Sequence, residues 1–83
     1  MTVRARLFMK PDCHLCEDVV AHLDRLQRQL PHELEQVDIS ADADLLRRYG
    51  QRIPVLELAG HEYAAPLPPT VLERALREAA QQR

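Results

Sequence analysis

The chain has two cysteines, and both lie in one tetrapeptide, Cys13-His14-Leu15-Cys16. Thiols at this spacing can exchange disulfides, bind a metal ion, or play no chemical part. Two cysteines can form only one disulfide within the chain, which excludes a framework of several structural disulfides. In a reducing compartment such a pair is more often catalytic or metal-binding than a structural cross-link. Disulfide exchange is therefore the first chemistry to consider, and metal binding the second.

Cys13 is expected at the turn between a first strand and a first helix. Residues 3–9 begin with apolar and basic side chains in alternation and end in an apolar run, which predicts a strand that becomes buried toward its end. Lys10-Pro11-Asp12 ends this strand, and Asp12 is the expected N-cap of the helix. From Cys16 onward, apolar residues recur at three- and four-residue steps, which predicts a helix that Pro31 ends.

The start of a helix favours a thiolate over a thiol. The first N–H groups of a helix are unpaired and the helix dipole is positive there, so cysteines at such places can have pKa values of roughly 3.5–7.5 instead of about 8.5. Cys16 is expected one turn inside the helix on the same side, close to Cys13 and more buried. These positions assign Cys13 as the nucleophile and Cys16 as the resolving cysteine. His14, beside the nucleophile, is expected to tune the thiolate modestly.

The remaining elements must position this pair. The patterns predict a strand at 34–39, a short helix that ends at Tyr49, a hairpin of strands at 55–58 and 61–63, and a helix at 70–81. The element order is then βαβαββα, in which the first strand–helix–strand unit is a right-handed parallel crossover. The sequence predicts one α/β domain over residues 1–83, with a four-stranded mixed sheet and helices on both faces.

Composition excludes several classes of function. The net charge is −2, and aromatic residues make up 4% of the chain, so neither a basic patch nor a set of stacking rings indicates nucleic-acid binding. Apolar runs are short, and the first residues lack the apolar stretch of a secretory signal, which argues against a membrane protein. We expect a cytoplasmic monomer.

A metal site is the main chemical alternative. A lone C-x-x-C can be half of a zinc site, but the histidines of the chain lack the H-x3–5-H spacing that such a site uses. Haem attachment requires a histidine directly after the second cysteine, where this chain has Glu17. His22, His32 and His61 are expected at the surface. We therefore predict no metal site and no tightly bound cofactor.

The sequence also resembles a known family. Lys10-Pro11-Asp12-Cys13-His14-Leu15-Cys16, followed further along by Arg52-Ile53-Pro54-Val55 and by Gly60 in the next turn, resembles the glutaredoxin branch of the thioredoxin superfamily. More narrowly, the chain is similar to small bacterial glutaredoxin-like proteins whose active site reads C-x-L-C. The resemblance covers essentially the whole chain. It implies a thioredoxin fold with strand order 2-1-3-4 and a cis peptide bond at Pro54, facing the cysteines.

The same resemblance implies a substrate site that includes Lys10, His14, Ile53 and Pro54. The Ile53 backbone would pair with an extended cysteinyl substrate, and Lys10 matches a basic residue that helps glutaredoxins to hold a glutathione carboxylate. Glutathione would be a co-substrate rather than a bound cofactor. The chain departs from the usual glutaredoxin pattern at residues 64–68, where Ala-Ala-Pro-Leu-Pro replaces the Gly-Gly and Ser/Thr-Asp step that grips the glutamyl end of glutathione.

The resulting hypothesis is a thiol–disulfide oxidoreductase in cell redox homeostasis. Its substrates would be disulfide-containing proteins or glutathione mixed disulfides, attacked by Cys13 and released by Cys16. One alternative is a thioredoxin-fold binding module whose cysteines hold zinc or an iron–sulfur cluster or which docks a partner protein. Another is an interaction domain whose cysteines are idle.

Overall fold

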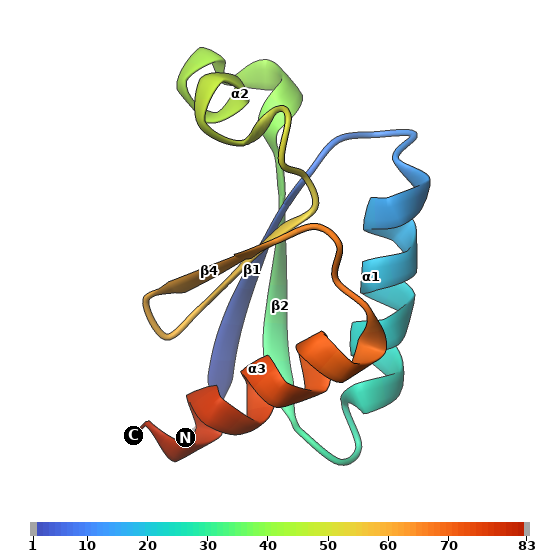
Figure 1. Cartoon of the computed structure of the whole chain (residues 1–83), viewed down its shortest axis with the longest axis vertical. Coiled ribbons are helices and arrows are strands. Elements are labelled where there is room, and N and C mark those ends of the chain that lie inside the picture. The colour runs from blue at the N-terminus through green and yellow to red at the C-terminus, as the bar shows by residue number, and fades with distance from the viewer. Residues whose placement is uncertain (1, 83) are drawn as a thin grey trace.

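The computed structural model describes residues 2–82. Its elements are β1 (Val3–Met9), α1 (His14–Leu26), β2 (His32–Asp38), the 3-10 turn η1 (Ile39–Ala41), α2 (Ala43–Tyr49), β3 (Val55–Leu58), β4 (His61–Ala64) and α3 (Pro69–Gln81). The strands form one sheet in the order β2-β1-β3-β4, with β1 and β2 parallel and the other pairs antiparallel (Figure 1). The predicted βαβαββα order and the strand order 2-1-3-4 are confirmed.

The main hydrophobic core lies between the sheet and the helices α1 and α3. Alternate residues of β1 point to opposite faces, so Ala5 and Leu7 enter this core while their neighbours do not. Leu23 of α1 and Leu76 of α3 are almost fully buried against them. Each helix presents one apolar stripe to the sheet, as the three- and four-residue spacing predicts.

The other face of the sheet is covered by α2 at one end only. Phe8 of β1 stacks on Tyr49 of α2 with 4.2 Å between the ring centroids, and Ile39 and Val55 complete this smaller core. Toward the start of β1 the face carries charged side chains. Arg6 lies 3.5 Å from Glu35 and 3.3 Å from another glutamate, Glu57 of β3, in the closest N–O pairs.

Two expectations about the ends of α1 and one about His32 of β2 are wrong. The helix begins after Cys13, not Asp12, because Asp12 adopts a left-handed backbone with φ 60° and Cys13 becomes the N-cap. The helix ends at Leu26, well before Pro31, because β2 pairs with β1 from its first residue, His32, and the chain must turn before it. His32 is 5% exposed rather than a surface residue, and its Nδ1 lies 2.7 Å from the Leu30 carbonyl oxygen.

Within residues 2–82, every helix is too short or too polar to cross a membrane.

Candidate active site

Cys13 forms the N-cap of α1. Its backbone is extended, with φ −106° and ψ 104°, and its side-chain sulfur accepts a hydrogen bond from the Cys16 N–H at 3.2 Å. Its carbonyl oxygen accepts the Glu17 N–H at 3.0 Å, which is the first hydrogen bond of the helix. A cap normally uses an oxygen acceptor, and here sulfur takes that place. A donor aimed at sulfur favours the thiolate, because hydrogen bonding to the charged form stabilises it.

The left-handed backbone of Asp12 is what brings Cys13 to this position. Its φ of 60° turns the chain sharply between the end of β1 and the first turn of α1. Aspartate is among the few residues other than glycine that adopt this conformation at modest cost. The Lys10-Pro11-Asp12 step therefore does more than end the strand, since it sets the direction in which the cysteines point.

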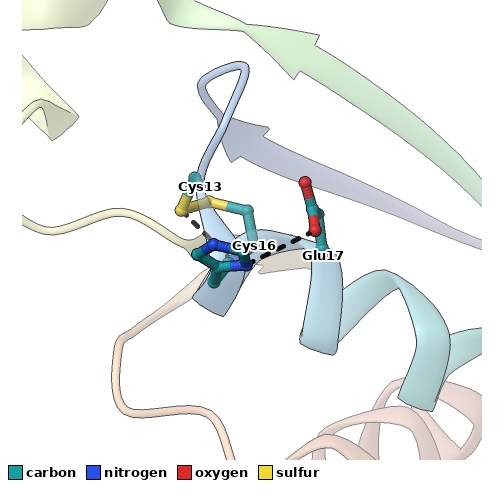
Figure 2. The surroundings of a disulfide bond; sticks show 4 residues. Cys13, Cys16 and Glu17 are labelled. Atoms are coloured by element: carbon teal, nitrogen blue, oxygen red, sulfur yellow. Dashed lines mark hydrogen bonds and ion pairs between the residues drawn. A yellow bond between two sulfur atoms is a disulfide. The ribbon is translucent and has the colours of Figure 1, made fainter.

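Cys13 and Cys16 are joined by a disulfide at the first turn of α1, with 5.2 Å between their Cα atoms (Figure 2). Their surroundings differ. Cys16 is 0% exposed and packs in the interior, whereas Cys13 is partly exposed at the rim. A reagent in solution can therefore reach Cys13 more easily than Cys16.

The side chain of His14 is exposed to solvent. Its exposed fraction is 96%, and its Nδ1 lies 3.8 Å from Glu17 Oε1, the carboxylate seen beside the disulfide in Figure 2. An ion pair this exposed contributes at most about 1 kcal/mol. Glu17 was not among the residues predicted for the site, although its spacing from His14 places both on one face of a helix.

The Ile53–Pro54 segment lies next to the cysteine turn. The peptide bond between these residues is cis, and Pro54 is buried directly before Val55, the first residue of β3. Val55 pairs with Phe8 of β1, which brings the entrance of β3 to the end of β1 from which the cysteine loop emerges. In Figure 1 the loop before β3 and the loop between β4 and α3 both lie near the start of α1.

A groove of about 280 Å³, here called the Leu15 groove, includes in its lining the leucine that lies between the two cysteines. It is lined by Leu15, Asp18 and His22 of α1, by Pro54, and by residues 65–68. The groove brings Pro54 and Leu15 of the C-x-x-C turn together, but its lining does not include the two cysteines, Lys10, His14 or Ile53. Lys10 directly follows β1 and is partly exposed.

Comparison with known proteins identifies the family. The family description "Glutaredoxin-like domain (DUF836)" matches residues 4–81, almost the whole chain. The chain belongs to the glutaredoxin-like domain family. The resemblance drawn from the cysteine motif and the Ile53-Pro54 step is thereby confirmed.

Solved structures agree with this glutaredoxin-like assignment. A structural genomics target from X. campestris is 33% identical, with TM-score 0.80 over 90% of this chain and 97% of that one. Protein Ne2328 from Nitrosomonas europaea is 30% identical, with TM-score 0.77 over 89% of this chain and 91% of that one. Mitochondrial thioredoxin 3 from Saccharomyces cerevisiae, in its oxidised form, is 20% identical with TM-score 0.68 over 92% and 77%, and shows the shared fold. No curated protein matches the sequence.

Two further features of this glutaredoxin-like site bear on its chemistry. Among residues 2–82, no three His, Cys, Asp or Glu side chains gather where they could hold a metal ion. Leu15, the leucine of the C-x-L-C motif, is 62% exposed between the two cysteines, and it was not among the residues predicted for the site. The sequence did carry a sign of this exposure, because Leu15 is an apolar residue at a helical position outside the buried stripe.

Proposed function

We propose that this glutaredoxin-like chain is a thiol–disulfide oxidoreductase. The observation that carries the proposal is the asymmetric cysteine pair. The Cys13 sulfur caps α1, accepts the Cys16 N–H at 3.2 Å and is partly exposed, whereas Cys16 is fully buried behind it. A stabilised thiolate that solvent can reach, with a second thiol within bonding distance, is the arrangement that disulfide exchange requires.

The proposed reaction has two exchange steps. The Cys13 thiolate attacks one sulfur of a substrate disulfide, so that a mixed disulfide forms and the other substrate sulfur leaves as a thiolate. The Cys16 thiolate then attacks the Cys13 sulfur and expels the second substrate thiolate. The substrate gains two electrons and the cysteine pair loses them as it closes into the disulfide. A thiol or dithiol donor restores the reduced pair.

The proposed substrates are protein disulfides or glutathione mixed disulfides. The Ile53 backbone, next to the buried Pro54, supports this proposal, because an extended substrate could pair with it in the manner of an added strand. Lys10 would offer a positive charge to a substrate carboxylate, and His14 would add positive charge near Cys13 when it is protonated. These substrate roles follow from the family resemblance and are part of the proposal.

The first experiment measures reduction of a small uncharged disulfide by the wild type, Cys13→Ser and Cys16→Ser proteins with a thiol donor. We expect Cys13→Ser to abolish turnover. Cys16→Ser should accumulate a mixed disulfide that mass spectrometry detects, because the resolving thiol is gone while the Cys16 position still supplies its backbone N–H. If Cys13→Ser retains the parent rate, the proposed mechanism is wrong.

The second experiment measures the alkylation rate of Cys13 against pH in reduced Cys16→Ser protein. Because only the thiolate reacts, the rate follows the thiolate fraction. We expect the midpoint to lie below about 8.5, the pKa of a free cysteine. A midpoint at or above that value would show that the helix start does not activate Cys13, and would favour an interaction domain with idle cysteines.

A further inference from the structure

We propose that the Leu15 groove selects protein disulfides in which an apolar residue neighbours the reacting cysteine, in preference to glutathione. The inference rests on the proposed function and narrows its substrate class. It starts from the lining of the groove, which includes Pro54 and Leu15, the residue between the two cysteines that precedes Cys16. A side chain next to a cysteine bound at Cys13 would lie within reach of the groove.

Leu15 gives the lining of the groove an exposed apolar side chain. Its 62% exposure makes it the one exposed large hydrophobic side chain among the described residues. The leucine is held there by the backbone of α1, between the two cysteines, so it remains exposed while Cys16 is buried. Covering such a side chain with an apolar partner is favourable, because apolar surface leaves water.

Residues 65–68, which form another wall of the groove, offer few donors to an anionic ligand. Pro66 and Pro68 have no N–H, and the Ala65 N–H donates to the Arg52 carbonyl at 3.4 Å. Within residues 65–68 this leaves the Leu67 N–H as the remaining backbone donor. A glutathione carboxylate needs several donors or a cation, and this wall supplies little of either.

The charges of the groove also oppose glutathione. Its lining contains the carboxylate of Asp18 and no lysine or arginine. Glutathione carries more carboxylates than ammonium groups at neutral pH, so Asp18 repels it. An extended polypeptide has neutral amides near its cysteine, and a basic residue in it would be attracted to Asp18. The occupant that fits is therefore an extended cysteinyl segment with one apolar neighbour and one basic residue.

The test uses three symmetric disulfides and reduced wild-type protein in single-turnover reactions. Two are disulfides of the capped tripeptides Leu-Cys-Lys and Ser-Cys-Lys, and the third is glutathione disulfide. In each reaction Cys13 takes one thiol of the substrate into a mixed disulfide and Cys16 releases it, so two substrate thiols form. We expect the Leu peptide to react about tenfold faster than the Ser peptide, which corresponds to about 1.4 kcal/mol, and glutathione disulfide to react more slowly than either peptide.

Two variants and one control test which side chains cause the preference among the three disulfides. Leu15→Ser should lower the preference for the Leu peptide over the Ser peptide from about tenfold to less than about twofold, because it removes the apolar contact. Asp18→Asn should speed the reaction with glutathione disulfide by about threefold relative to the Ser peptide, because an exposed charge is lost. Ala21→Ser, on an exposed position of α1 outside the groove, is the control and should keep the wild-type preference.

The outcomes separate this inference from the proposed function. Equal rates for the two peptides in the wild type, or a faster reaction with glutathione disulfide, would overturn the groove proposal and leave a working oxidoreductase. An unchanged peptide preference in Leu15→Ser would also overturn it. Failure to reduce any of the three disulfides would instead overturn the proposed function and the groove proposal together. The wild-type comparison needs no variant, so the proposal stays testable even if a variant folds poorly.

Discussion

The Tyr49 side chain shows how a buried polar group is satisfied where α2 covers the sheet. The Tyr49 hydroxyl donates to Glu62 Oε2 at 2.6 Å, and this hydrogen bond raises the pKa of Tyr49 above its usual value of 10.0. Arg48 and Arg52 lie near the same carboxylate, 3.9 and 3.6 Å from its oxygens. The hydrogen bond between Tyr49 and Glu62 links α2 to β4, two elements that otherwise share little of the main core.

We predict that Tyr49→Phe lowers the free energy of unfolding at neutral pH by about 1.5 kcal/mol, because a hydrogen bond to a charged acceptor is lost. The raised pKa means that this contribution is fully present below pH 10.0 and disappears as the pH rises through the pKa of the folded state. Wild type and Tyr49→Phe should therefore converge in alkaline solution. Urea unfolding at neutral and alkaline pH checks both points.

Tyr63→Phe is the matched control for that measurement. Tyr63 lies on β4 and packs against the main core. Removing its hydroxyl should change stability by less than about 0.5 kcal/mol. If the two substitutions cost the same, or if the loss in Tyr49→Phe does not shrink as the pH rises, then the hydroxyl of Tyr49 is not the source of the stabilisation.

At the scale of the elements, the β3–β4 hairpin turns on Ala59 and Gly60. Both residues have positive φ, 49° and 83°, as the central positions of a type I′ turn require. Glycine tolerates this conformation, and alanine is strained in it. Ala59, at the first central position of the turn, is therefore the strained residue of the two.

We predict that Ala59→Asn stabilises the protein by about 0.5–1 kcal/mol, because asparagine tolerates the left-handed conformation. The melting temperature should rise by about 2–8 °C in a domain of this size. Gly60→Ala is the contrasting variant. An added Cβ there has nothing within 4 Å, but the φ of 83° strains it, so the melting temperature should fall. If Ala59→Asn lowers the melting temperature, the strain at Ala59 has been overestimated.

The order of elements could be predicted from the sequence because it is encoded by local periodicity. The apolar steps in α1 and α3 and the alternation in β1 and β2 each repeat over several turns or residues, so the patterns are strong. The predicted end of α2 at Tyr49 is also local, since Gly50 follows it directly. For these elements the predicted type and order agree with the structure, although the ends of α1 do not.

The features that sequence reasoning missed depend on distant parts of the chain. The early end of α1 and the burial of His32 both follow from the pairing of β2 with Val3, which no local pattern reveals. The Leu15 groove exists only because residues 65–68 fold back beside α1. Cys13 was correctly placed at the helix start, but its role as the cap depends on the left-handed Asp12. Tertiary contacts therefore decided both the boundaries and the shape of the site.

At the scale of the whole molecule, the sheet has two open edges, β2 and β4. Open edges can pair with other chains, and natural proteins protect them with charge or by keeping them short. The edge strand β2 carries Glu33 and Glu35 on the charged face, where each lies within 3.5 Å of an arginine of β1. The other edge, β4, is only four residues long.

We predict that the protein is a monomer of 9.6 kDa in solution, because both edges resist the addition of a strand. Replacing the β2 charges in the double variant Glu33→Val/Glu35→Val should produce species whose mass rises with concentration, because β-branched apolar residues on an open edge favour pairing. Light scattering over a range of concentrations measures this. The double variant Glu73→Val/Glu78→Val makes the same change in charge on helix α3, and should stay monomeric because a helix offers no edge. Dimers of the wild type, or equal association of the two variants, would show that edge charge does not control assembly.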